Sequence, residues 1–131
     1  MRVKVAIRQG LKQGKCMGRA PYGYYNDKNT KLVHIDSATQ DLVNFAFQTF
    51  ATGAYSIEEV RHMAILRGCS LQKQQFINML SNPFYIGKIF IKALADEPEQ
   101  FIDGLHDPIV DRQTFTKVQE ILAGKKKPYL G

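Results

Sequence analysis

Apolar positions are densest between residues 37 and 53, and they predict the central helix of the fold. Asp36 or Ser37 can cap its start, and Gln40 stands three residues after Ser37, as in a capping box. Gly53 follows the end of the pattern. Apolar side chains cover most of the circumference: Leu42, Val43, Phe45, Ala46, Phe47 and Phe50. Because a helix with so little polar surface must be covered on most sides, we expect a helix over 37–51 in the middle of the core.

The next pattern predicts two shorter helices joined by a brief connection. Ser56 and Glu59 form a capping box that opens a helix over 57–66. Ser70 is expected to cap a second helix over 71–80, which Pro83 ends. The connection between them contains a glycine and is only four residues long. This is the arrangement of a helix-turn-helix unit.

Less regular patterns lie on both sides of these helices. They predict a helix over 2–13, a linker and turn over 14–29, a strand over 31–35, a hairpin of strands 85–91 and 100–102 joined by the loop 92–99, and a last helix that Asp111 caps and Gly124 closes. With 131 residues the chain is long enough for one domain with a real core. The expected fold class is α+β, mostly helical, with a helix-turn-helix and a short β-hairpin.

The charge of the chain is unevenly distributed. The net charge is +6, but residues 1–31 hold eight Lys and Arg residues against one acidic residue. Residues 92–120 hold three basic residues against seven acidic ones, and a basic tail follows at 125–127. A chain polarised in this way can present one face to phosphates and keep another away from them. The alternative is two solvated surfaces with no partner.

The helix over 71–80 carries the candidate residues for reading DNA. Its outer positions are polar and include no acid: Gln72, Lys73, Gln74, Gln75 and Asn78. Gln and Asn side chains pair with the N6 and N7 atoms of adenine, and Lys pairs with guanine O6 and N7. The second helix of a helix-turn-helix lies in the major groove. We therefore expect these side chains to contact bases, the alternative being a polar surface helix of a helical domain.

The N-terminal run supplies the candidate residues for the DNA backbone or the minor groove. They are Arg8, Lys12, Lys15 and Arg19. Gly14, Gly18 and Pro21 allow an extended, thin backbone there, which suits the minor groove. The alternative is a solvated terminus that contacts nothing. The segment 21–24 is expected to be structural, although its tyrosines could also stack on bases.

The sequence shows no active site. The four serines all stand at predicted helix caps or ends, and the pair His106 and Asp107 precedes Pro108 in a probable turn. Cys16 and Cys69 are isolated, and the histidines have no metal-ligand spacing, so we expect free thiols, no metal and no cofactor. No apolar run is long enough to cross a membrane, and no signal peptide is visible. We expect a cytoplasmic, nucleoid-associated protein encoded by a bacterium or phage.

Several blocks of the sequence occur in a recognisable order: 18–24, 32–35 leading into Asp36, 47–53, 80–87, and 106–111 followed by Phe115 and Val118. Together they resemble the recombinase domain of the large serine recombinases, the family of phage serine integrases and related transposases, over roughly residues 10–123. It implies a domain that binds double-stranded DNA at half of an attachment site. The segment near Lys15 and Arg19 would follow the minor groove, and the helix over 71–80 would enter the major groove.

The resemblance also implies a division of the chain and two missing domains. Residues 1–13 would end a helix that connects from a catalytic domain, 14–30 would be the basic linker, 31–123 the DNA-binding domain, and 124–131 a basic tail. The arginine-and-serine motif of the catalytic domain and the zinc-ligand cysteines of the downstream zinc ribbon are not in this sequence. Leu71 stands where the family often has tryptophan. The chain would then be an excised piece or a truncated product that binds DNA without recombining it.

Two other classes of function remain open at this stage. A free-standing helix-turn-helix transcriptional regulator would need its own dimer interface, whereas a separated recombinase domain is expected to be monomeric. A protein-interaction module could use the acidic region 96–107, and it would not bind DNA.

Overall fold

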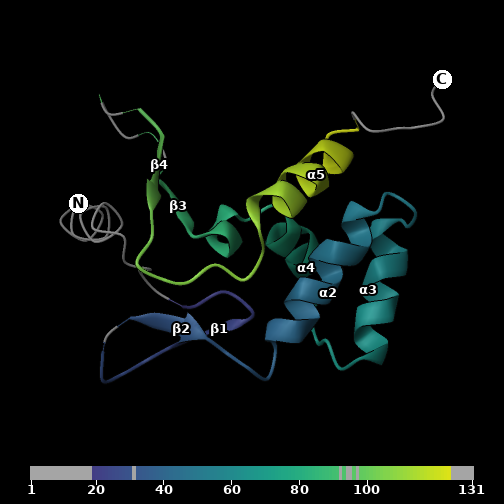
Figure 1. Ribbon diagram of the computed structural model, residues 1–131, viewed down its shortest axis with the longest axis horizontal. Helices are drawn as coiled ribbons and strands as arrows, with labels where there is room; N and C mark the ends of the chain where they lie inside the picture. The colour runs from purple at the N-terminus through teal and green to yellow at the C-terminus, as the bar shows by residue number, and fades with distance from the viewer. Residues whose placement is uncertain (1–18, 31, 92, 94–95, 97, 125–131) are drawn as a thin grey trace.

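The computed structural model describes residues 19–30, 32–91, 93, 96 and 98–124, with helices gathered at one end and two hairpins at the other (Figure 1). The predicted helix over 2–13 lies outside the described residues. The elements in chain order are β1 (Tyr24–Asn26), β2 (Val33–Ile35), α2 (Gln40–Ala51), α3 (Ile57–Leu66), α4 (Lys73–Leu80), the 3₁₀ helix η1 (Pro83–Ile86), β3 (Lys88–Ile91), β4 (Gln100–Asp103) and α5 (Arg112–Leu122). The architecture is α+β, as the sequence predicts.

Helix α2 is the centre of the core, as its apolar pattern predicts. Val43, Ala46 and Phe47 are fully buried, and the helix packs against both α3 and α5. Its predicted start at Ser37 is wrong, because the helix begins at Gln40 with Thr39 in the cap position. The side chain of Asp36 accepts a hydrogen bond from the amide of Ala38 at 3.0 Å. This local turn holds residues 36–38 outside the helix.

The connection between α3 and α4 is longer than predicted. Ser56 and Glu59 form the expected capping box at the start of α3. The predicted cap at Ser70 is wrong, because α4 begins at Lys73 and Gln72 is its cap. The backbone N–H of Gln72 donates to Oε1 of Gln75 at 2.9 Å, which fixes the start two residues later. The connection is therefore 67–72, and Leu71 lies outside the helix.

The end of α3 is closed by a Schellman motif. The amide of Cys69 donates to the carbonyl of Ala64, and the amide of Gly68 donates to that of Ile65, both at 3.0 Å. Gly68 has φ +110°, a conformation that side chains with a Cβ rarely adopt. This closure turns the chain sharply toward α4.

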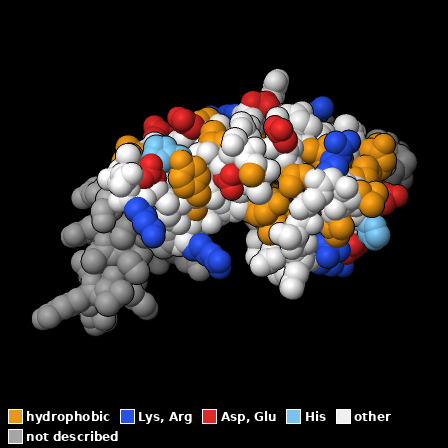
Figure 2. Space-filling view, turned by 90° about the horizontal axis from the view of Figure 1, so that it is seen from below, with side chains coloured by type: hydrophobic (Ala, Val, Ile, Leu, Met, Phe, Trp, Pro, Cys, Tyr) orange, Lys and Arg blue, Asp and Glu red, His pale blue; other side chains and the backbone are white. Residues whose placement is uncertain are grey.

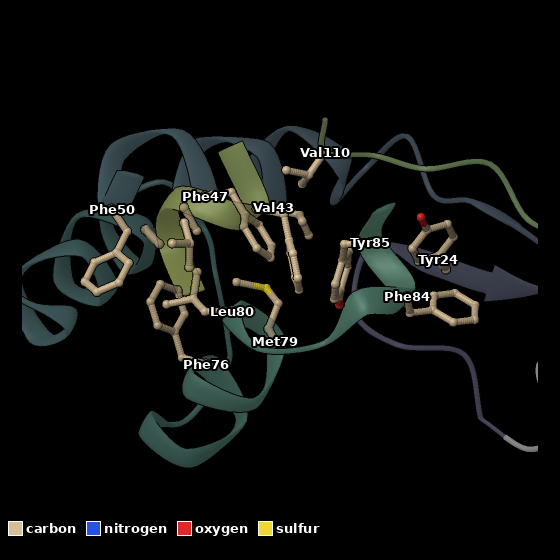
Figure 3. Close-up of a cluster of buried hydrophobic side chains, with 14 of the residues drawn as sticks. Tyr24, Val43, Phe47, Phe50, Phe76, Met79, Leu80, Phe84, Tyr85 and Val110 are labelled. Carbon is tan, nitrogen blue, oxygen red and sulfur yellow. The ribbon is translucent and has the colours of Figure 1, made fainter. Parts of the chain in front are cut away.

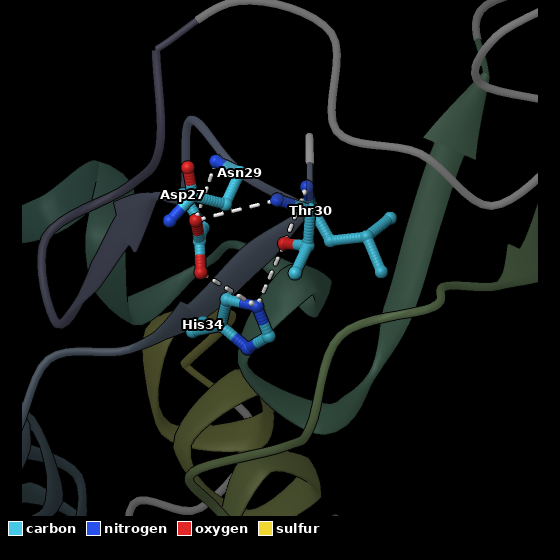
Figure 4. Close-up of polar contacts among 5 residues, drawn as sticks. Asp27, Asn29, Thr30 and His34 are labelled. Atoms are coloured by element: carbon cyan, nitrogen blue, oxygen red, sulfur yellow. Dashed lines mark hydrogen bonds and ion pairs between the residues drawn. The ribbon is translucent and has the colours of Figure 1, made fainter.

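The first hairpin contains a strand that the sequence pattern did not predict. β1 pairs antiparallel with β2, and Tyr24 lies opposite Ile35. The turn between them is held by polar contacts around Asp27 (Figure 4). Its Oδ1 accepts from the amide of Asn29 at 2.8 Å, and its Oδ2 lies 3.4 Å from Nε2 of His34. The hydrogen bond from Asn29 lowers the pKa of the Asp27 carboxyl, with a smaller contribution from His34.

The predicted strand over 85–91 is wrong in its first part. Residues Pro83–Ile86 form the 3₁₀ helix η1, because the Oδ1 of Asn82 accepts from the amide of Phe84 at 3.0 Å and caps it. Gly87, with φ +84°, ends η1 and redirects the chain into β3. β3 and β4 then form the predicted antiparallel hairpin, with Lys88 opposite Asp103. The predicted cap at Asp111 is confirmed, since its Oδ2 accepts from the amide of Thr114 at 3.1 Å.

One row of buried side chains joins the helical end to the strand end (Figure 3). It runs from Phe50 through Phe47 and Tyr85 to Tyr24. The hydroxyl of Tyr85 donates to the carbonyl of Tyr22 at 2.5 Å, and the hydroxyl of Tyr24 donates to the carbonyl of Asp107 at 2.6 Å. Burial raises the pKa of both tyrosines, so they stay protonated donors. These contacts fix the strands and the loop before α5 to the helices.

Candidate nucleic-acid interface

Helix α4 carries all of the candidate base-reading residues on its exposed side. Gln72, Lys73, Gln74, Gln75 and Asn78 are exposed. The opposite side of the helix is anchored by Phe76, Met79 and Leu80, which are buried in the core. Because three anchors fix so short a helix, its polar side is held rigidly toward solvent. The structure thus brings these five polar residues together on one surface.

The contacts among these side chains separate their roles. The Oε1 of Gln75 caps α4, so this residue stabilises the helix start. Gln74 donates its amide to Oδ1 of Asn78 at 3.1 Å, which aligns the two amides along the helix. Nζ of Lys73 lies 3.5 Å from a carboxylate oxygen of Glu58 on α3. Gln74 and Asn78 thus form an exposed amide pair, whereas Lys73 is engaged with an acidic partner on the neighbouring helix.

Of the four candidate backbone contacts, only Arg19 lies within the described residues, and it is exposed. Arg8, Lys12 and Lys15 lie outside them. The chain after Arg19 is fixed to the first hairpin, because the amide of Ala20 donates to Oδ1 of Asn26 at 2.9 Å. Tyr24 is buried and packs edge-on against Phe84, with ring centroids 5.0 Å apart. The chain at Ala20 is thus held at a fixed point of the fold.

A groove of about 660 Å³ separates this point from α4. Pro21 lines it on the linker side and Asn78 on the helix side. The rest of its wall is Ser81, Asn82, Pro83, Phe84, Lys88, Ile89, Phe90 and Phe101. Figure 2 shows the molecule hollowed between its strand-bearing end and its helical end, with Lys and Arg side chains on both sides of the hollow. No sequence signal predicts this groove, because its wall comes from four separate segments.

The histidine and serine side chains considered as catalytic candidates make structural contacts. Nε2 of His106 lies 2.6 Å from the carbonyl of Phe84, and the two rings stack with centroids 3.5 Å apart. Burial lowers the pKa of His106. The pair His106 and Asp107 is thus part of a packed turn, and the side chains of Ser56 and Ser81 bond the backbone of helices α3 and α4.

Three further observations apply to the described part of the chain. No cluster of three or more His, Cys, Asp or Glu residues there could hold a metal ion. None of the helices in the same part is long and apolar enough to cross a membrane. Cys69 is a buried free thiol, and Cys16 lies outside the described residues.

Comparison with known proteins decides the family. The model of the Recombinase family matches residues 37–125, which is more than half of the chain. The chain belongs to the recombinase family. The match includes α4, the groove-lining residues from Asn78 to Phe101, and the cap of α5.

Solved structures show the same fold for the recombinase chain. A crystal structure of an LSR–DNA complex (LSR, large serine recombinase) matches with a TM-score of 0.75, 20% identity and 94% of this chain covered. A structure concerned with the sequence requirements of the Listeria innocua prophage attP site matches with the same three values. The recombinase chain spans 39% and 52% of those two chains. No curated protein sequence matches it significantly.

Proposed function

We propose that this recombinase domain binds double-stranded DNA and recognises half of an attachment site. In this proposal α4 lies in the major groove, and the segment that ends at Arg19 follows the adjacent minor groove. The observation that carries the proposal is the exposed side of α4, where five polar side chains stand on a helix that three buried side chains anchor. Membership of the recombinase family and likeness to a large serine recombinase solved with DNA support it.

The chemistry of the α4 surface suits base edges. An amide group can donate to one base atom and accept from another, which matches adenine in the major groove. Gln74 and Asn78 present such amides one helical turn apart. The helix itself carries no acidic residue that would repel phosphates. Glu58 on α3 is the nearby acid, and its charge is shared between Lys73 and Arg61.

The strand-exchange chemistry of the parent protein belongs, in this proposal, to another domain. Ser56 and Ser81 are used at helix ends, and His106 is buried in a ring stack. Catalysis needs a nucleophile within hydrogen-bond reach of its activating group. This chain would then recognise the DNA site, and a separate catalytic domain would cleave the DNA. As an isolated domain it would be monomeric, whereas a free-standing regulator would be a dimer.

The two proposed contact sets can be separated by mutation. Lys15→Ala removes a backbone contact and should weaken binding to all duplexes alike, by about tenfold or less. Gln74→Ala removes a base contact and should change which duplexes are preferred, at about 1–3 kcal/mol for the affected base pair. The measurement is binding of each variant to duplexes selected from a random-sequence pool by the unsubstituted protein. Equal losses on every duplex from both variants would argue against the groove assignment.

A further inference from the structure

The groove between Pro21 and α4 lies where a DNA strand would have to pass, and this inference rests on the proposed function. Each strand of a duplex separates the major groove from the minor groove. If α4 occupies one groove and the Arg19 segment the next, the sugar-phosphate backbone of one strand runs between them. The structure has an open groove at that place, with Asn78 of α4 on one wall and Pro21 on the other.

Three hydrogen-bond donors line this groove. The Oδ1 of Asn78 is occupied by Gln74, and the Oδ1 of Asn82 is occupied by the amide of Phe84. Each side chain therefore keeps its NH₂ group to donate to a ligand. Lys88 adds an ammonium group, which pairs with Asp103 in this structure. Amide and ammonium donors of this kind suit a phosphate group.

The rest of the wall is apolar and suits the sugars. Phe84 and Ile89 are buried beneath the groove, and Phe90 packs against Phe101 with ring centroids 5.0 Å apart. Phe101 remains 59% exposed. An exposed aromatic pair beside donor groups is the composition expected where a deoxyribose packs and its phosphate is hydrogen-bonded.

We infer that this groove binds the sugar-phosphate backbone of the DNA strand that lies between the two proposed contacts. Asn82 and Lys88 donate to its phosphates, and Phe90 and Phe101 pack on its sugars. The ammonium of Lys88 exchanges the Asp103 carboxylate for a phosphate when the strand enters. Asp103 therefore competes with DNA, and the β3–β4 hairpin becomes a third DNA-contacting element beside the linker and α4.

Charge variants with matched controls test this inference by fluorescence anisotropy on a duplex of random sequence. Lys88→Gln should weaken binding about tenfold, whereas Lys117→Gln, the same change on α5, should have a much smaller effect. Asp103→Asn should strengthen binding, and more than Glu99→Gln, the same change in the loop outside the groove. Phe101→Ser should weaken binding to all duplexes alike, with Leu66→Ser on α3 as its control. Thermal unfolding confirms that each variant is folded.

Neutral phosphates provide a second test that changes no residue. Methylphosphonate groups are placed one at a time along a duplex selected by the unsubstituted protein. At one position in each half-site, the methylphosphonate should weaken binding by the unsubstituted protein. The same methylphosphonate should not weaken binding by the Lys88→Gln variant. The inference would be overturned if each variant binds DNA as its control does and no methylphosphonate position has this effect. This holds even if the protein binds DNA. Absence of any DNA binding by the unsubstituted protein would instead refute the proposed function.

Discussion

Individual residues of α4 either stabilise the helix or form its exposed polar surface. Gln75 and Gln74 are adjacent and both exposed on α4, but their contacts differ. Gln75 accepts from the backbone of Gln72, whereas Gln74 bonds only along the surface, to Asn78. The sequence treats the two glutamines as equivalent candidates, and only the position of the helix start distinguishes them.

This difference predicts unequal losses of stability from two alanine substitutions. Gln75→Ala should lower the free energy of unfolding by about 0.5–1 kcal/mol, because it removes half of the capping box. Gln74→Ala should lower it by less than about 0.5 kcal/mol, since it removes one surface pair. Urea unfolding of both variants measures this. A larger loss from Gln74→Ala would show that the cap at Gln72 is assigned wrongly.

His106 should make stability depend on pH near neutrality. Burial lowers the pKa of the folded-state imidazole below its unfolded value, so the neutral form is favoured on folding. Its contribution is present above the unfolded pKa of about 6.5 and is lost as the pH falls through the lower folded pKa. Urea unfolding between pH 7.5 and about pH 5.5 should show this loss, and His106→Phe should reduce it. An unchanged pH dependence in His106→Phe would contradict the assignment.

At the scale of elements, the turns are as important as the helices for placing the interface. Gly23, between Pro21 and β1, has φ +94°, and a Cβ built on it would lie 2.8 Å from Cγ2 of Val43. Gly68, between α3 and α4, has φ +110° and nothing within 4 Å of such a Cβ. Both turns need glycine for the backbone, but only the first also needs it for packing.

The two glycines therefore predict unequal costs for the same substitution. Gly68→Ala should destabilise by about 1–2 kcal/mol through backbone strain alone. Gly23→Ala carries that strain and also crowds Val43, which adds about 1–3 kcal/mol. Urea unfolding of both variants gives the comparison. Equal costs would mean that the linker does not pack closely against α2.

The sequence predicted those elements whose signals are local. Ser56 with Glu59 and Asp111 with Thr114 mark the starts of α3 and α5, because a cap involves only neighbouring residues. The sequence pattern predicts the start of α4 two residues early, because serine caps helices more often than glutamine does. The observed cap is Gln72, whose amide donates to Oε1 of Gln75. The segment 85–87 looked like a strand because it is apolar, yet the Asn82 cap and Gly87 turn it into a 3₁₀ helix.

Features that depend on contacts between distant segments cannot be predicted from the sequence pattern. The strand β1 has three residues among glycine and proline, and it exists because β2 pairs with it. The groove is lined by Pro21, the end of α4, η1 and both strands of the second hairpin, which only the folded chain brings together. The candidate residues of α4 could be named from the sequence because one helix carries them all.

At the scale of the whole molecule, the proposed role is to bind and position DNA, with strand cleavage assigned to a separate domain. The chain spans 39% and 52% of the two solved chains it resembles. Its basic N-terminal quarter and acidic later segment are separated along the sequence. The linker, α4 and the groove would then contact one continuous stretch of duplex, mainly through its phosphates.

The most direct test of this account is the salt dependence of duplex binding by the 131-residue chain, measured by fluorescence anisotropy. Each phosphate contact releases counterions, so log Kobs should fall linearly with log salt by about 0.9 per contact. Contacts from the linker and the groove predict a slope steeper than about −3. An affinity for duplex DNA that does not change with salt, or no measurable binding at low salt, would contradict the central claim.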